Sequence, residues 1–202
     1  MKTRHLSVPG AVELTPPVHR DGRGRFLEWF RADVFTALAG APLGVAQANC
    51  SVSAAGTLRG IHFAQLPPGQ GKYVTCLHGA ALDVVVDIRS GSPCYGHWDA
   101  VRLDDETHRA VWLPPGVGHA FMALADDTLV TYLLSSPYDP EREHSISPLD
   151  PAIGIDWPTT GRDGRPLTPL LSDRDAAAPT LEEVRRRGLL PEHGPTGPGD
   201  RL

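Results

Sequence analysis

The side chains in this chain that could do chemistry are concentrated in one short stretch, from Gln47 to Lys72. Two cations, Arg59 and Lys72, lie on either side of His62, and Gln47 and Asn49 add amide groups. The intervening residues are mostly strand-forming residues and glycines. Polar groups of this kind are costly to bury in a β-sheet unless something polar binds there. The stretch therefore predicts a site for an anionic ligand, next to a group that titrates near neutral pH.

His62 is the candidate general base, although a lone histidine is more often a structural residue. Arg59 and His62 have opposite strand parity, so both can reach one pocket only if the strand bulges, and Gly60 permits a bulge. A neutral histidine held by a carboxylate is a competent general base. The loop tetrapeptide Ser172-Asp-Arg-Asp175 could supply that carboxylate or could simply decorate the surface.

Two further residues suit proton-transfer chemistry. Lys72 follows a turn rich in proline and glycine, and it is either a solvated lysine or a cation aimed at developing negative charge, such as an enolate oxygen. Tyr132 lies in an apolar strand, where its phenol is either a core group or a partner for a ligand. The acidity of a phenol also suits proton donation to a carbanion.

A metal site is the competing interpretation of the histidines. His119 begins a strand after a glycine-rich turn and could ligate a metal together with His62. A catalytic metal needs three protein ligands. The His-x-His pair of metal-binding cupins is missing, because Ala64 stands where the second histidine would be. We therefore expect no metal.

Short strands must position these residues. Between residues 45 and 135, roughly seven or eight apolar or alternating segments are separated by turn signals, with no helix between them. This pattern predicts an all-β, antiparallel sandwich or small barrel. Short helices are expected over 31–39, before Gly40, and over 180–187, where a capping-box pattern opens the helix.

Composition predicts one globular domain over residues 1–190, followed by a disordered tail over 191–202. The formal net charge of −5 argues against nucleic-acid or membrane-surface partners. The three cysteines form no CxxC pair, which is typical of reduced thiols in the cytoplasm. The chain has no apolar run of transmembrane length.

At this point the chain resembles a known family, the dTDP-4-dehydrorhamnose 3,5-epimerases of deoxysugar biosynthesis. The resemblance covers about residues 1–190 and is closest to actinobacterial members. It rests on ten ordered motifs: Asp21-Gly-Arg-Gly-Arg-Phe-Leu-Glu, Gln47-Ala-Asn-Cys-Ser-Val-Ser, Leu58-Arg-Gly-Ile-His-Phe, Gln70-Gly-Lys-Tyr-Val, Asp83-Val-Val-Val-Asp-Ile-Arg, Gly91-Ser-Pro-Cys-Tyr-Gly, Gly118-His-Ala-Phe, Tyr138-Asp-Pro-Glu-Arg-Glu-His, Asp156-Trp-Pro and Leu171-Ser-Asp-Arg-Asp.

The resemblance implies a cupin-type jelly roll, a homodimer, and no metal or organic cofactor. It also implies the substrate dTDP-4-dehydro-6-deoxy-D-glucose and the product dTDP-4-dehydro-L-rhamnose. The C4 ketone acidifies the hydrogens at C3 and C5. A base removes one of them, an enolate forms, and a proton returns on the opposite face.

The resemblance also assigns roles to residues. The base is His62, paired with Asp175, and Tyr132 is the acid on the opposite face, while Lys72 would stabilise the enolate oxygen. The positions that match substrate contacts are Arg23, Glu28, Gln47, Asn49, Arg59, His119, Tyr138, Glu143 and Arg174. Asp83 would support the base from behind, and Tyr138 would stack on the thymine.

One departure keeps alternatives open. Many members of the family have glycine after the histidine of Gly118-His-Ala-Phe, where this chain has Ala120. Some relatives in antibiotic pathways epimerise only C3 or only C5, so a monoepimerase is the first alternative. A sugar-nucleotide binding protein without turnover and a metal-dependent cupin are the others.

Overall fold

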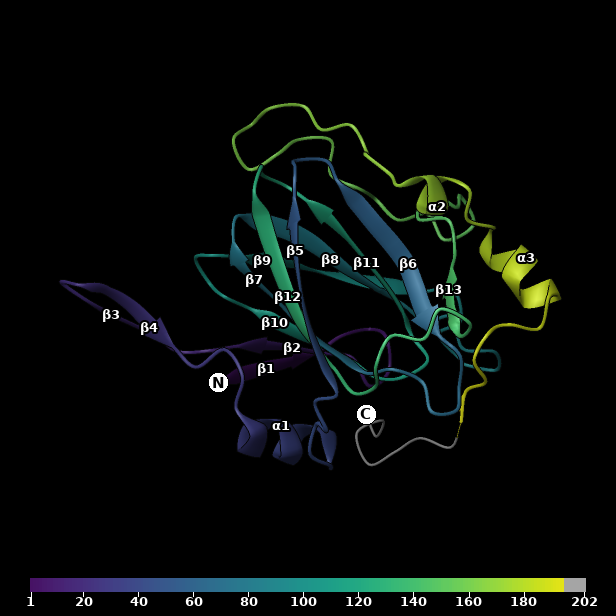
Figure 1. Cartoon of the computed structure of the whole chain (residues 1–202), viewed down its shortest axis with the longest axis horizontal. Coiled ribbons are helices and arrows are strands. Elements are labelled where there is room, and N and C mark those ends of the chain that lie inside the picture. Colours follow the sequence, from purple (N-terminus) through teal and green to yellow (C-terminus); the bar gives the residue numbers. More distant parts are fainter. Residues whose placement is uncertain (195–202) are drawn as a thin grey trace.

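The structure is a computed structural model and describes residues 1–194 of the chain. Two antiparallel sheets pack face to face, which confirms the predicted all-β jelly roll (Figure 1). The six-stranded sheet has the order β1 (Lys2–His5), β2 (Val12–Thr15), β10 (Ala110–Leu113), β7 (Lys72–His78), β12 (Thr128–Leu134) and β5 (Gln47–Ser53). The five-stranded sheet has the order β13 (Glu143–Ser145), β6 (Leu58–Ala64), β11 (Gly118–Ala123), β8 (Ala80–Val86) and β9 (Trp98–Asp104).

The core between the sheets follows from strand alternation. In β8, Ala81 and Val85 face the interior, whereas Val84 and Val86 pack on the outer side of the five-stranded sheet. Successive side chains of a strand point to opposite faces, so one strand serves both layers. This arrangement agrees with the alternation expected from the sequence, and it leaves the interior to apolar residues except at one end.

Short helices cover the outer faces. Helix α1 (Ala32–Ala39) packs Phe35 against Trp112 on the six-stranded sheet, with ring centroids 4.8 Å apart, and ends at Gly40 in the left-handed conformation. Helix α3 (Leu181–Arg186) lies over the five-stranded sheet and opens with the predicted capping box of Thr180 and Glu183. The remaining helix, α2 (Asp173–Ala176), is a single turn beside β6 (Figure 1).

A hairpin of β3 (Val18–Asp21) and β4 (Gly24–Leu27) projects from the sandwich, on the side away from α2 and β13 (Figure 1). Phe26, near its end, is 67% exposed. An exposed ring of this size on a projecting hairpin is a candidate contact for another protein surface. Strand β4 ends at Leu27, because Trp29 and Phe30 turn to pack with Tyr73 and α1.

The predicted tail begins at residue 191, and its first residues pair with the domain. Ser90 N donates to Pro191 O at 2.8 Å, and His193 N donates to Ser90 O at 2.8 Å. The part of the predicted tail after residue 194 lies outside the described residues. No helix within residues 1–194 is both long and apolar enough to cross a membrane.

Candidate active site

The polar end of the interior brings together most of the residues singled out from the sequence. His119 lies opposite His62 in the pairing of β11 with β6. It shares the inner face with the core residues Val117 and Phe121, which are two positions away on either side. Tyr132 packs against the same core from β12 on the other sheet. The inner-face positions at this end are Gln47 and Asn49 on β5, Arg59 and His62 on β6, Lys72 on β7, Asp83 on β8, His119 on β11, Tyr132 on β12 and Glu143 on β13.

A bulge in β6 turns Arg59 and His62 to the same face, as the sequence predicted. Arg59 pairs with Phe121 and His62 with His119, so Gly60 and Ile61 together oppose Ala120 alone. Gly60 has φ +126°, and a Cβ built there would lie 2.5 Å from the Cβ of Ala120. Only glycine fits this position, which gives the site two adjacent polar side chains on one strand.

His62 is held by a carboxylate from a distant part of the chain. Its Nε2 lies 2.7 Å from Oδ1 of Asp175 on α2. Burial alone would raise the pKa of Asp175, but hydrogen bonds from His62, Ser172 and the Gly60 backbone outweigh it and lower the pKa. The carboxylate is therefore ionised and accepts the Nε2 proton. The other ring nitrogen keeps a free lone pair that can take a proton from a substrate.

A second histidine–aspartate pair lies beside the first. The side chain of Asp83 is fully buried, and its Oδ2 lies 2.7 Å from Nε2 of His119. The prediction that Asp83 supports the base must be refined, because the carboxylate bonds to His119 and no hydrogen bond joins it to His62. Oδ1 of Asp83 is buried and has no hydrogen-bond partner among the described residues.

Lys72 places a buried cation between the two sheets. Burial lowers the pKa of its ammonium group, and the nearby carboxylates of Glu143 and Asp83 oppose that shift. A cation removed from water acts on neighbouring charge more strongly than one on the surface. Lys72 can therefore stabilise negative charge that develops on a bound ligand.

The base and the phenol come from opposite walls. His62 belongs to the five-stranded sheet and Tyr132 to the six-stranded sheet, with their inner faces turned toward each other. A flat intermediate lying between the sheets would have the imidazole on one side and the phenol on the other. This arrangement suits removal of a proton from one face and its return on the other.

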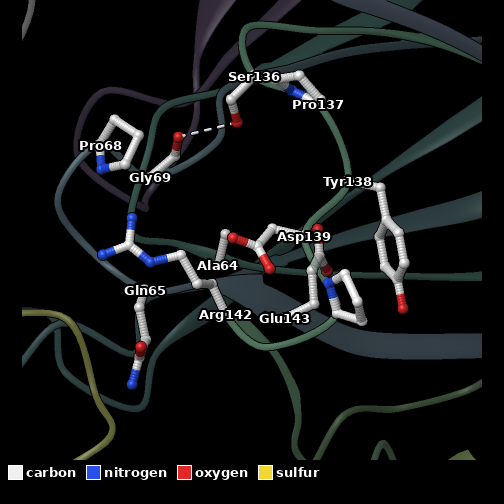
Figure 2. Close-up of a pocket in the computed structure, with 11 residues that line it drawn as sticks. Ala64, Gln65, Pro68, Gly69, Ser136, Pro137, Tyr138, Asp139, Arg142 and Glu143 are labelled. Carbon is white, nitrogen blue, oxygen red and sulfur yellow. Dashed lines mark hydrogen bonds between the residues drawn. The ribbon is translucent and has the colours of Figure 1, made fainter.

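A cavity of about 350 Å³ opens next to this end of the sandwich, between the loops that follow β6 and β12. Figure 2 shows Tyr138 and Arg142 on different sides of it, with Glu143 at its edge. Gln47 steadies the second loop, because its Oε1 accepts a 2.8 Å hydrogen bond from the backbone N–H of Tyr138. Its Nε2 donates to Oδ1 of Asn49 at 2.8 Å.

Sequence reasoning did not find this cavity. Its lining includes Gln65, Pro68 and Arg142, none of which was identified from the sequence. The signal was the proline clustering in both loops, which we used only as turn markers.

Of the other predicted contacts, Arg23 and Glu28 pair with residues in or near the projecting hairpin, whereas Arg174 lies next to Asp175 on α2. Arg23, at the hairpin tip, bonds to Asp21 at 2.6 Å, and Glu28 faces Arg31 at 3.7 Å. Arg174 is exposed and donates to the backbone oxygen of Glu143 at 3.1 Å. Figure 1 places the hairpin on the far side of the sandwich from α2.

Ala120, the departure from the family pattern, does not face the site. It is 1% exposed and packs with Ile61 and Val84 on the outer side of the five-stranded sheet. Its methyl group is next to His119 in sequence but on the opposite face of the sheet, because β11 alternates and His119 takes the inner position. A Cβ added at Gly60 would meet this methyl group at 2.5 Å, so Ala120 lies against the bulge that turns Arg59 and His62.

Among residues 1–194, no three histidine, cysteine or acidic side chains form a group that could hold a metal ion. The site is instead a pair of histidine–aspartate dyads, a buried lysine and a phenol in the open end of a jelly roll. These features define an acid–base enzyme of the cupin-like jelly-roll class.

Comparison with known proteins gives the family. The model of the dTDP-4-dehydrorhamnose 3,5-epimerase family matches residues 5–183, and the chain belongs to this family. It is 56% identical to the dTDP-4-dehydrorhamnose 3,5-epimerase of Mycobacterium tuberculosis strain H37Rv, over 95% of this chain and 93% of that protein.

Solved structures agree with this assignment. A Mycobacterium tuberculosis epimerase superimposes with a TM-score of 0.91 at 56% identity, covering 95% of this chain and 94% of that one. A 3′-monoepimerase from Streptomyces bikiniensis in complex with dTDP-quinovose gives 0.87 at 52% identity, covering 93% and 91%. The Legionella pneumophila 3,5-epimerase in complex with dTDP-4-keto-L-rhamnose gives 0.87 at 36% identity, covering 96% and 99%.

Proposed function

We propose that the protein epimerises C3 and C5 of dTDP-4-dehydro-6-deoxy-D-glucose to give dTDP-4-dehydro-L-rhamnose. The observation that carries the mechanism is the placement of His62, paired with Asp175, and Tyr132 on opposite walls of one polar interior. Family membership supports the substrate class, since the Legionella relative binds dTDP-4-keto-L-rhamnose.

In the first step, the free ring nitrogen of His62 takes the proton from C3. The C3–H bond breaks, and its electrons form an enolate whose oxygen is the former C4 ketone. The Lys72 ammonium stabilises this oxygen. Tyr132 then donates its phenolic proton to C3 from the opposite face, which inverts the centre and restores the ketone. Before the same sequence can run at C5, His62 must give up the proton that it took and Tyr132 must regain one from solvent; the second inversion then completes the reaction.

The other groups position the sugar nucleotide. Arg59 suits a phosphate oxygen of the diphosphate, and His119, oriented by Asp83, suits a sugar hydroxyl. The cavity beside Tyr138 and Glu143 has room for the thymine ring of the nucleotide, on which Tyr138 would stack. Gln47, bonded to Asn49, holds the loop that carries Tyr138, and Arg174 donates to the backbone oxygen of Glu143.

The decisive experiment is proton NMR of the purified protein with dTDP-4-dehydro-6-deoxy-D-glucose in D₂O, following C3 and C5 separately. Deuterium at both carbons, with an L-rhamno product trapped by a downstream reductase, is the expected result. Deuterium at C3 alone would establish a 3-epimerase. The similarity to the Streptomyces bikiniensis 3′-monoepimerase supports this alternative. Absence of exchange at both carbons would exclude epimerase activity on this substrate and favour a binding protein.

We also propose a homodimer in which the β3–β4 hairpin of each protomer completes the site of its partner. Arg23 and Glu28 match substrate-contacting positions of the family, yet the hairpin carries them away from His62 of their own chain (Figure 1). Exposed Phe26 on the same hairpin would be covered by the partner. A symmetric dimer would use both hairpins in the same way.

Complementation tests this dimer. Arg23→Ala and His62→Ala should each be inactive alone, but a co-expressed mixture should regain about one quarter of the wild-type sites, because half of the dimers are mixed and each has one intact site. A matched mixture of His62→Ala with Asp175→Asn should stay inactive, since both residues act within one chain. No recovery in the first mixture would place Arg23 outside the partner's site.

The three free thiols suit a reducing compartment, and we place the protein in the cytoplasm on that ground.

A further inference from the structure

The strand next to the base carries a hydroxyl that the proposed mechanism does not use. Ser145, the last residue of β13, pairs in register with His62 on β6. Its Oγ is buried and has no hydrogen-bond partner among residues 1–194. Buried hydroxyl groups without a partner are uncommon in native proteins, and each one calls for an explanation.

The strand pairing brings Ser145 close to the imidazole. Ile61 and Ile146 exchange both backbone hydrogen bonds, at 2.9 Å each. The next pair, His62 with Ser145, is therefore the non-hydrogen-bonded kind, whose Cα atoms approach to about 4.5 Å. Side chains of such a pair lie closer together than those of the hydrogen-bonded kind.

Both side chains point to the inner face. The neighbouring pair, Phe63 and His144, points outward, with ring centroids 5.5 Å apart and Phe63 in the outer core. Strand alternation then places His62 and Ser145 on the side of the site.

A hollow of about 250 Å³ lies between β13 and the segment that carries α2 and α3. Its lining includes Ser145, Arg174, Ala177 and Val184, from β13, α2 and α3. This volume has room for several water molecules. Ser145 thus both pairs with the base in the strand ladder and belongs to the lining of a second hollow.

The reaction requires such a route. Each inversion leaves His62 with the proton that it removed, and His62 must lose that proton before it can act on the second carbon. In the proposed complex, the sugar nucleotide fills the mouth. Asp175 is a poor acceptor, because its hydrogen bonds lower its pKa.

We propose that Ser145 relays the proton from His62 to water in the hollow behind β13. Oγ accepts the proton from the ring nitrogen that faced the substrate, and the Ser145 hydroxyl passes its own proton to a water molecule. His62 returns to the neutral form, Ser145 stays neutral, and one proton enters the solvent. Rotation about the single side-chain torsion of Ser145 turns the hydroxyl between the ring and the hollow.

The test measures where the substrate's hydrogen goes. In D₂O, the wild type should place deuterium in recovered substrate, because His62 exchanges its proton before returning one. In Ser145→Ala, the original hydrogen should return instead, and the ratio of exchange to epimerisation at the first carbon should fall by about tenfold or more. Ser145→Thr, which keeps the hydroxyl, should retain exchange.

Two controls isolate the relay. Ser147→Ala removes a nearby hydroxyl that bonds to the backbone N–H of Leu149 at 3.4 Å, and it should leave the ratio unchanged. The melting temperature of Ser145→Ala should not fall, because its hydroxyl has no partner to lose. An unchanged ratio in Ser145→Ala, or equal loss in the alanine and threonine variants, would overturn the relay.

This inference rests on the proposed function, and the two fail in different ways. Absence of deuterium uptake by the wild type would exclude the epimerase activity itself. Normal uptake by the wild type, together with an unchanged Ser145→Ala, would exclude the relay alone.

Discussion

At the scale of single residues, two carboxylates hold two neighbouring histidines in different surroundings. Asp175 holds one nitrogen of His62 at 2.7 Å and leaves the other free, in a side chain that remains 32% exposed. Asp83 holds His119 at the same distance, but that ring is almost fully enclosed. The exposed dyad can reach a reacting carbon, whereas the enclosed dyad is suited to fixing a ligand in place.

Replacing Asp175 with asparagine should reduce kcat by roughly 10² to 10⁴-fold, the range expected when a positioned general base loses its orienting group. Asparagine cannot accept the Nε2 proton with an ionised oxygen, so the ring loses both its orientation and its stabilised charge. Steady-state kinetics with a coupled reductase measures the change. Asp173→Asn, exposed on the same helix, is the matched control and should retain wild-type turnover.

Replacing Tyr132 with phenylalanine should separate proton removal from inversion. Deuterium should still enter recovered substrate, because His62 is intact, while the epimerised product should fall by roughly 10²-fold or more. NMR in D₂O records both quantities in one experiment. Tyr95→Phe removes a buried phenol that also lacks a partner among the described residues, and it should change neither. Equal product yield from Tyr132→Phe would remove this residue as the acid.

At the scale of elements, the bulge in β6 does what a regular strand cannot. Arg59 and His62 are three positions apart, so a regular strand would direct them to opposite sheet faces. The extra residue at Gly60 shifts the alternation by one position, so that both side chains face the interior. Strand β11 passes so close to Gly60 that no side chain fits at this position.

Gly60→Ala should therefore destabilise the protein by about 2 kcal/mol or more, from the positive φ and the contact with Ala120 and the His119 backbone. Activity should fall further than stability, since the two polar side chains would no longer share a face. Denaturant unfolding and kinetics on the same sample test both effects. Gly22→Ala, where no atom lies within 4 Å of the added Cβ, should be tolerated.

The sequence was informative wherever a local pattern decides the structure. Alternation in β8, the glycine end of α1 and the capping box of α3 all follow from neighbouring residues, and the structure has each of them. The bulge was predictable because Arg59 and His62 have opposite strand parity, and only a bulge at Gly60 could bring both to one face.

Long-range placement could not be read in the same way. The pairing of Asp83 with His119 depends on how β8 and β11 lie side by side, and alternation alone does not reveal it. The outward direction of Ala120, by contrast, follows from strand parity, because its neighbour His119 faces inward. The projecting hairpin was missed because a turn signal does not show what a hairpin packs against.

At the scale of the whole molecule, a buried ion pair ties separate segments together. Arg89 donates to both carboxylate oxygens of Asp87, at 2.9 and 2.8 Å, and also to the backbone oxygen of Pro9 at 3.1 Å. Ser92 adds a 2.6 Å bond to the same carboxylate. Next to this pair, Ser90 bonds to Pro191 and His193, so both ends of the described chain converge there.

This pair predicts an acid-sensitive stability. Burial would raise the pKa of Asp87, but Arg89 and Ser92 outweigh it and lower the pKa. Its contribution is therefore full above about pH 4, the ordinary aspartate value, and is lost as pH falls through the lower value of the folded state. Asp87→Asn should flatten the fall in melting temperature below pH 4, whereas exposed Asp127→Asn should not.

Arg89→Met should be more damaging than the loss of one surface contact, because it leaves an uncompensated buried carboxylate. We expect a loss of about 3 to 5 kcal/mol at neutral pH. Denaturant unfolding measures it, and Arg186→Met, whose side chain is 67% exposed, is the control. A loss below about 1 kcal/mol, as for a surface ion pair, would show that the Arg89–Asp87 pair does not hold these segments together.

His62 and Asp175 are 113 positions apart in the chain. During synthesis, the jelly-roll strands, the lysine and the phenol all leave the ribosome before the carboxylate that makes the histidine a base. In the proposed mechanism, a growing chain therefore contains the base long before it contains the carboxylate that orients it. Under that mechanism, catalytic competence is a late event in the synthesis of each molecule, because it waits for the segment that carries Asp175.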